Sequence, residues 1–281
     1  MAEAATPSNE KPVVPMKEAL IKRHSTRNFN KKEWTQEEFD FVQSVVNEAN
    51  ELPKPFGTDF TLVLAPKGFG LLNFIVNEKG WIFAKVPLSP EQKMVKFDIG
   101  YLFEYIIMRL TQHNVGTCFI AGTYLQDKAI TFCGGNCDVP AVIAFGGEDS
   151  DRWLDSFVKW CGSFRGANTF KDKFFDLKQN IPITEESAGE RMDACQAAAK
   201  IPCAMKPHAY RVIFDEPLIH IYDDPPPNSK YSGYSLYDIG NVVTNLSLYY
   251  KEVENKTVKV ELLQDAPQCP LGGKYICSLS I

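Results

Sequence analysis

The N-terminal half of the chain alternates between helical and strand-like patterns of apolar residues. Thr35 and Glu38 form a capping box, and behind them apolar side chains recur on one helix face, at Phe39, Val42, Val45, Val46 and Ala49. A short helix is expected at Met16–Arg23, and Asp98 precedes a long apolar stretch, so we expect it to cap a longer helix. Between and after these helices, β-rich runs predict strands at Phe60–Ala65, Trp81–Val86, Gly116–Ala121 and Pro140–Phe145.

The same order of elements then begins again. Ser187 and Glu190 form a second capping-box pattern, which opens a helix to about Lys200, and Asp238 precedes and is expected to cap another long helix. Strands are predicted at Tyr210–Phe214, Leu218–Tyr222, Thr257–Leu263 and Lys274–Ser280. A tetrapeptide marks corresponding points of the two halves, as Phe97-Asp98-Ile99-Gly100 and Tyr237-Asp238-Ile239-Gly240. The pattern predicts an internal duplication and an α+β fold, with helices packed on mixed or antiparallel sheets.

Four segments follow from this pattern. Residues 1–15 are predicted to be a flexible tail, 16–147 the first repeat, 148–184 a connecting segment and 185–281 the second repeat. The connecting segment carries a helical pattern at Asp151–Trp160 and is too apolar for a flexible linker.

Charge and composition narrow the class of protein. The 281 residues include 30 basic and 35 acidic ones, a net charge of -5, which argues against a nucleic-acid partner. No apolar run approaches the roughly 18–20 residues of a membrane helix, and the first 15 residues lack a secretory signal, so we expect no membrane partner and a cytoplasmic location. The 8 cysteines and 4 histidines show no zinc-ligand spacing, so we expect reduced, mostly buried thiols and no metal.

One short segment carries the clearest chemistry. In an extended backbone, side chains alternate, so Arg23, Ser25 and Arg27 project to the same side. Two guanidinium groups and a hydroxyl are suited to a phosphate dianion, which takes several charge-assisted hydrogen bonds. The pattern also fits a solvated basic turn near the N-terminus. Both interpretations stay open on the residues alone.

Three motifs together resemble a known family. Arg23-x-Ser25-x-Arg27-x-Phe29, the glycine-bounded run Gly116–Gly122 and the apolar run Val139–Gly146 are similar to motifs of the FMN-dependent nitroreductase superfamily. The order of motifs over about residues 16–281 is closest to compact nitroreductases with a tandem repeat inside one chain. The resemblance implies a three-layer nitroreductase-like fold that holds FMN between two similar halves, here a pseudo-dimer within one chain. A monomer or a homodimer is compatible with it.

The resemblance also implies an activity and a set of cofactor-binding residues. The activity is transfer of electrons from NAD(P)H, a transient donor, through FMN to nitroaromatic, quinone or related small-molecule acceptors. Arg23, Ser25 and Arg27 match the positions that hold the phosphate and ribityl chain, and His24 lies within that motif. Gly122 matches the glycine whose neighbourhood presents a backbone amide to flavin N5, and Ala121 stands where many relatives carry glutamate.

Two segments depart from the family pattern. Pro202, Cys203 and Lys206 belong to a loop that resembles the family's contact with the flavin pyrimidine edge, but it is shorter and lacks the asparagine. Lys206 there would place positive charge near N1 and C2=O, or is simply an exposed lysine. After Gly147 the chain is acidic where relatives are often basic, which leaves Arg152 and Arg165 as substitutes in the phosphate clamp.

No residue is nominated as catalytic, because hydride transfer through a flavin requires no protein acid or base. An alternative from another class is a flavin- or ligand-binding protein on the same scaffold with little or no turnover, which the two departures favour. A third is a cofactor-free interaction module. Bound FMN without NAD(P)H oxidation distinguishes the second hypothesis from the first, and failure to take up FMN distinguishes the third.

Overall fold

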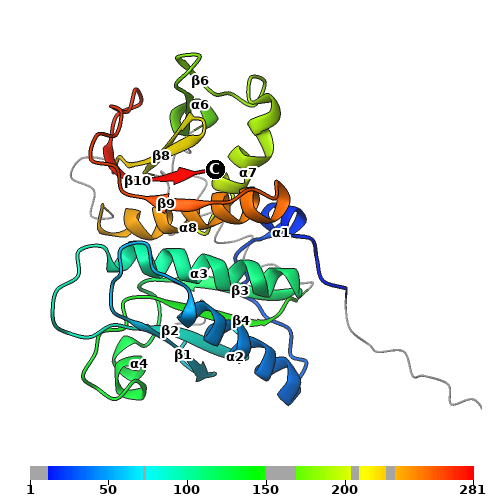
Figure 1. Ribbon diagram of the computed structural model, residues 1–281. Coiled ribbons are helices and arrows are strands. Elements are labelled where there is room, and N and C mark those ends of the chain that lie inside the picture. The colour runs from blue at the N-terminus through cyan, green and yellow to red at the C-terminus, as the bar shows by residue number, and fades with distance from the viewer. Residues whose placement is uncertain (1–11, 72–73, 150–168, 204–208, 226–231) are drawn as a thin grey trace, which may run out of the picture.

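Two long helices, α3 (Val95–Gln112) and α8 (Ser235–Leu248), lie side by side between two sheets in the computed structural model (Figure 1). The structure describes residues 12–71, 74–149, 169–203, 209–225 and 232–281. The largest group of buried apolar residues includes side chains from both helices and from both sheets. The result is the α+β fold that the sequence predicts, with a helical layer between two layers of strands.

The first sheet has four strands, all in antiparallel pairs, in the order β1-β2-β4-β3. Their bounds are β1 Thr61–Pro66, β2 Gly80–Lys85, β3 Val115–Ile120 and β4 Val142–Gly147. The two inner strands are buried along almost their whole length, as expected for continuous apolar runs. Three further helices belong to this half, α1 (Met16–Lys22), α2 (Gln36–Glu51) and α4 (Gln126–Phe132). The predicted capping box of Thr35 and Glu38 is present at the start of α2.

The second sheet has six strands in the order β6-β5-β7-β8-β10-β9, and only the pair β5–β7 is parallel. Their bounds are β5 Phe174–Asp176, β6 Ile181–Pro182, β7 Tyr210–Asp215, β8 Leu218–Asp223, β9 Lys259–Glu261 and β10 Lys274–Ser280. The helical elements are α6 (Phe170–Lys173), η1 (Gly189–Arg191), α7 (Met192–Ala199), η2 (Ser232–Tyr234) and a π-helical turn, η3 (Tyr249–Val253), that continues α8.

The two halves share a topology. Along the chain, α2-β1-β2-α3-β3-β4 corresponds to α7-β7-β8-α8-β9-β10, except that the first half has the additional helix α4 between β3 and β4. In the sheets, the order β1-β2-β4-β3 corresponds to β7-β8-β10-β9. The internal duplication itself stays a prediction, and this common order of connection and of strand pairing supports it.

The backbones of α3 and α8 approach each other most closely at the repeated tetrapeptide. A Cβ added to Gly100 would lie under 3.0 Å from backbone atoms of Tyr237, and one added to Gly240 would lie under 3.0 Å from backbone atoms of Phe97 and Tyr101. The contact is therefore reciprocal, as in an isologous interface between two copies of one surface. Next to it, the Thr244 hydroxyl donates to the carbonyl of Tyr101 at 2.7 Å.

The capping roles predicted for Asp98 and Asp238 are wrong. Each is the fourth residue of its helix, after the N-cap residues Met94 and Tyr234. The buried Asp98 carboxylate instead accepts hydrogen bonds from the Phe56 and Thr58 amides, in the loop between α2 and β1. Asp238 accepts one from the Cys203 thiol at 2.9 Å, in the corresponding loop between α7 and β7. The two aspartates tie loops to the central helices because those loops present donors to the buried carboxylates.

Two other expectations differ from the structure, and a third concerns residues that the structure does not describe. Ser187 and Glu190 do not cap a helix, because Ser187 exchanges hydrogen bonds with Thr184, and α7 begins only after a 3-10 turn. The strand predicted at Thr257–Leu263 is limited to three residues of β9. The helix predicted at Asp151–Trp160 lies outside the described residues, and so does Cys161. The seven cysteines that the structure describes form no disulfide with one another; six of them are buried, as predicted, and Cys203 is half-buried.

Substituting alanine for Gly100 or Gly240 is expected to destabilise the protein. Glycine to alanine in a helix ordinarily stabilises by about 1 kcal/mol. Here the new methyl group would meet backbone, so we expect a net loss of roughly 1–3 kcal/mol in the free energy of unfolding. Urea denaturation measures it. Gly122→Ala is the matched control, because a Cβ at Gly122 has nothing within 4 Å; equal stability of Gly240→Ala and this control would contradict the proposed close crossing.

Candidate functional site

The Arg-x-Ser-x-Arg segment runs as extended chain beside β3. Ser25 forms a parallel bridge with Thr117, and the Thr26 amide donates to the Thr117 carbonyl at 2.8 Å. The approach is close, because a Cβ on Gly116 would lie 2.8 Å from the Thr26 hydroxyl oxygen. The glycine that begins the predicted turn motif thus allows this segment to lie against the first sheet.

Side chains of the segment alternate between two sides. Thr26 is buried, and its hydroxyl lies 3.4 Å from His24 Nε2, which is itself 3.7 Å from a carboxylate oxygen of Glu148. This places His24 and Thr26 on the side away from Ser25. The His24 imidazole therefore faces Glu148, and the geometry does not favour it as a contact for a ligand held by Ser25.

Arg23 connects the first half to the second. Its Nε donates to the carbonyl of Lys200, the C-cap residue of α7, at 2.8 Å. The terminal Nη nitrogens of Arg23 have no hydrogen-bond partner among the described residues. Burial lowers the pKa of Arg23, and the nearby charge of Arg27 lowers it further, whereas Glu104 and Cys118 act in the opposite direction. Two guanidinium groups are thus held near each other at the junction of the halves.

Ser25 lies between these two arginines in the sequence and adds a hydroxyl to the segment. The residue is half-buried, and within the described part of the chain its hydroxyl has no hydrogen-bond partner. Unpaired donors beside two positive charges are the chemistry that an anionic phosphate group requires. The donor set therefore fits the phosphate of FMN.

Polar side chains of α8 hold the end of α7 and the loop that follows it in place. Asn245 Nδ2 donates to the carbonyl of Ala197 and Asn241 Nδ2 to that of Pro202, each at 3.0 Å. With Arg23 on the Lys200 carbonyl, these bonds bind carbonyl groups at the end of α7 and in the loop beyond it. The Ala197 carbonyl also accepts from the Lys200 amide at 3.3 Å. The loop residues Pro202 and Cys203 are thereby fixed beside α8, near Arg23.

The residues that fix this loop were missed in the sequence. Asn241 and Asn245 lie four residues apart in an apolar helical stretch, and Glu104 interrupts the equally apolar α3. Polar residues on a helix face that the pattern marks as buried are the signal that would have singled them out, because such groups need partners.

Asp238 is the carboxylate beneath the loop. It is buried, and burial raises its pKa to about 7, against the hydrogen bond from Cys203, which lowers it. The sequence pattern suggests a flavin contact for Cys203 and only a capping role for Asp238. The structure pairs the two, with the half-buried thiol donating to the buried carboxylate.

Ala121 and Gly122 follow the end of β3, the strand that Ser25 and Thr26 flank. Ala121 is half-buried and Gly122 is exposed, with open space where its Cβ would be. The Phe119 ring lies 5.6 Å from the Tyr237 ring, which ties this end of the strand to α8. The space beside Gly122 is open, and β3 connects this end of the strand to the segment that carries Ser25. Lys206 and Arg165, also predicted to bind the cofactor, lie outside the described residues, as does Arg152.

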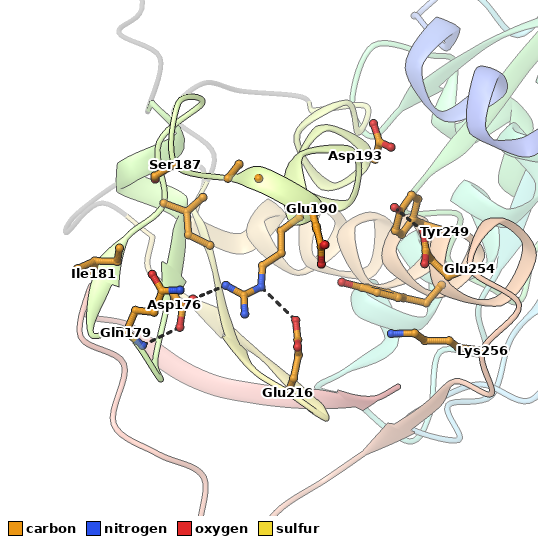
Figure 2. Close-up of a pocket in the computed structure, with 15 residues that line it drawn as sticks. Asp176, Gln179, Ile181, Ser187, Glu190, Asp193, Glu216, Tyr249, Glu254 and Lys256 are labelled. Carbon is orange, nitrogen blue, oxygen red and sulfur yellow. Dashed lines mark hydrogen bonds and ion pairs between the residues drawn. The ribbon is translucent and has the colours of Figure 1, made fainter.

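A polar cavity of about 640 Å³ lies elsewhere, on the second half (Figure 2). Arg191 pairs there with Asp176 and with Glu216, and the Tyr249 hydroxyl donates to Glu254 at 2.9 Å. Five acidic and two basic side chains line it, so its charge disfavours a phosphate group. None of the predicted cofactor-binding residues lines this cavity.

The described residues offer neither a metal site nor a membrane-spanning helix. No group of three or more His, Cys, Asp or Glu side chains there could hold a metal ion. Within the same ranges, no helix combines the length and apolar character needed to cross a bilayer.

Solved structures of nitroreductases are similar to this chain. Over its full length it is similar to a putative nitroreductase from Thermotoga maritima MSB8, with a TM-score of 0.62 and 16% identity, covering 98% of that chain; this shows the nitroreductase fold. The FMN-dependent nitroreductase NfnB from Mycobacterium smegmatis, solved in complex with NADPH, covers 50% of this chain and 90% of its own, with 12% identity and a TM-score of 0.41. A nitroreductase family protein from Clostridium difficile 630 covers 51% of this chain and 91% of its own, with 16% identity and a TM-score of 0.39.

No curated protein matches the chain. The sequence model of the family described as Putative TM nitroreductase matches residues 15–249. Since this match spans most of the chain, the protein belongs to the Putative TM nitroreductase family.

Proposed function

We propose that the protein is an FMN-dependent oxidoreductase that passes electrons from NAD(P)H to a nitroaromatic, quinone or related small-molecule acceptor. Membership of the nitroreductase family supports oxidoreductase chemistry at the level of the family. The observation that carries the proposal is the donor set at the junction of the halves. Arg23 and Arg27 are near enough there to affect each other, and within the described residues the Nη groups of Arg23 and the hydroxyl of Ser25 have no hydrogen-bond partner.

In this proposal, each part of the site has one task. FMN, when bound, supplies the chemistry of hydride acceptance and electron transfer. Arg23, Ser25 and Arg27 bind and orient its phosphate through charge-assisted hydrogen bonds. Gly122, which adds no side chain to the open space at the end of β3, leaves room for the ring and presents a backbone amide toward it.

The loop of the second half completes the site. Pro202 and Cys203, held by Asn241 and Asp238, contribute the edge that would face the pyrimidine end of the ring. Lys206 and Arg165 remain proposed contributors of positive charge. Because the two halves of one chain supply both sides, a monomer suffices for the site, although a homodimer remains compatible with it. A cytoplasmic location is part of the same proposal.

A second candidate is a flavin- or ligand-binding protein with little turnover. It is favoured by the acidic stretch after Gly147, since Glu148 lies where relatives often carry a basic residue and is 3.7 Å from His24 rather than facing an anion. The same phosphate site serves both candidates. Only turnover distinguishes them.

The visible absorbance spectrum of the full chain tests the cofactor. After incubation with FMN and desalting, we expect a retained flavin spectrum near one FMN per chain, since Arg-x-Ser-x-Arg occurs once in the sequence. Added NAD(P)H should bleach it, and nitro or quinone acceptors should restore it. A flavin that is retained but not reduced would support the second candidate instead, and a colourless protein would contradict both.

Replacing Arg27 tests the phosphate assignment. A hydrogen bond to a charged group contributes about 1.5–3 kcal/mol, so Arg27→Ala should raise the dissociation constant of FMN by roughly 10- to 100-fold. Titration of apoprotein with FMN, followed by quenching of flavin fluorescence, measures this. Lys31→Ala is the matched control, because it removes one positive charge at an exposed position in the same segment. Equal FMN affinity of the two variants would mean that Arg27 does not hold the phosphate.

A further inference from the structure

A buried carboxyl group lies beside the proposed phosphate site. Glu104, on α3, is 0% exposed, and neither of its carboxylate oxygens has a hydrogen-bond partner within the described structure. Taking an ionised carboxylate out of water without partners is among the costliest arrangements in a protein. The ionised form of Glu104 is therefore disfavoured here. A protonated Glu104 could instead donate a hydrogen bond to a neighbouring acceptor.

Three groups face Glu104 closely enough to affect it, from the elements packed around α3. They are Arg23 from the segment after α1, and Asn245 and Asp238 from α8. Among the described residues, no ion pair joins Glu104 to Arg23. Cys118 of β3 and Arg27 act on Arg23 from its other sides. The carboxyl thus lies within electrostatic range of a cation without contacting it.

Asn245 also has a buried polar atom without a partner in the described structure. Its Nδ2 is committed to the Ala197 carbonyl at 3.0 Å, which fixes the orientation of the amide, and its Oδ1 is buried with no partner in the described structure. Asn245 Oδ1 and both oxygens of an ionised Glu104 are therefore acceptors that lack a donor at hydrogen-bonding distance in the described structure, although the second N–H of Asn245 Nδ2 lies near enough to lower the pKa of Glu104. One proton on Glu104 would turn one of its oxygens into a donor and satisfy both groups at once.

We propose that Glu104 is a positioning residue that carries a proton, donates it in a hydrogen bond to Asn245 Oδ1, and so leaves the charge of Arg23 available to the phosphate group of the ligand. The ligand half of this inference rests on the proposed FMN site, whereas the protonation of Glu104 does not. An ionised Glu104 would offset the charge of Arg23 and compete with an anion for it.

The electrostatics of the site agree with this arrangement. Burial raises the pKa of Glu104 to about 8; Arg23 and Asn245 oppose this rise, and the nearby Asp238 adds to it. A dianion bound at Arg23 would raise the proton affinity of Glu104 further. By linkage, the proton strengthens ligand binding by the same factor by which the ligand strengthens proton binding.

The first test measures unfolding at different pH values and needs no ligand. A carboxyl whose folded pKa is raised keeps its proton in the native state when the unfolded chain has lost it, so stability falls as pH rises between the two values. Here the window is about pH 5 to 8. Relative to Glu104→Gln, whose amide can donate permanently to Asn245, the unfolding equilibrium constant of the wild-type protein should rise about tenfold per pH unit across this window.

The second test measures FMN binding from pH 7 to 9, where the phosphate, with a second pKa near 6, is already a dianion. The dissociation constant of the wild-type protein should rise about tenfold over this range, and that of Glu104→Gln should stay constant within about twofold. Calorimetry at pH 8 in buffers of different ionisation enthalpy should show proton uptake on binding to the wild-type protein only. A purely structural role for Glu104 would not produce proton uptake.

The outcomes of the two tests separate the protonation of Glu104 from its coupling to FMN binding. Parallel unfolding profiles of the wild-type protein and Glu104→Gln would show that Glu104 is ionised and overturn the inference. FMN binding with the same pH dependence in both proteins would overturn the coupling while leaving the proposed function intact. No FMN uptake at any pH would overturn the proposed function and the coupling together, and the unfolding profiles would still decide the proton.

Two further variants address the titration of Asp238 and a failure of Glu104→Gln to fold. Asp238→Asn removes the neighbouring carboxyl whose pKa is also raised. We expect the unfolding profiles to differ between wild type and Glu104→Gln in the same way when both carry Asp238→Asn. The difference should appear at a slightly lower pH, because Asp238 no longer raises the pKa of Glu104. If Glu104→Gln does not fold, Glu104→Met removes the titrating group with a side chain of similar length. It should likewise abolish proton uptake.

Discussion

The close crossing of α3 and α8 is the constraint on which the rest of the structure depends. Glycine at positions 100 and 240 lets the two backbones meet, where any Cβ would collide with the opposite helix. Both sheets then pack against this helical pair and share one apolar core with it. Because the contact is reciprocal, it also brings the corresponding loops of the two halves to equivalent places along the helices.

Burying two helices in this way forces their polar residues to find partners inside the protein. Asp98 and Asp238 take donors from the loops after α2 and α7, and Asn241 and Asn245 donate to carbonyls at the end of α7. Such buried polar contacts add little net stability, but each is costly to leave unmade. They therefore fix where the loops lie, and one of those loops forms an edge of the proposed flavin site.

Arg23 has two roles in this arrangement. Its Nε closes the C-terminal end of α7, which links the halves, and in the proposed site its terminal nitrogens bind the ligand. A cation at a helix C-terminus is also favoured by the helix dipole. If the proposed site is correct, a substitution of Arg23 would disturb both the structure and ligand binding. For that reason Arg27 and Glu104 are sharper probes of the site.

The sequence by itself determined the elements and their order. Apolar periodicity, glycine-bounded turns and the repeated tetrapeptide gave most helices and strands within a few residues, because these patterns reflect local geometry and burial. They also pointed to the Arg-x-Ser-x-Arg segment, for which a phosphate site and a solvated basic turn both stayed open. They failed for the caps at Asp98, Asp238 and Ser187, because an aspartate or serine near a helix start reads the same whether it bonds the helix or a distant loop.

Only the tertiary structure decided which residues meet. The pairing of Cys203 with Asp238, the bond from Arg23 to Lys200 and the isolation of Glu104 join positions 35 to 177 residues apart or depend on the packing of α3 on α8. No local pattern encodes such contacts. Side-chain chemistry is written in the sequence, but the partner of a buried polar group, and with it the group's protonation and role, is set by the fold that removes it from water.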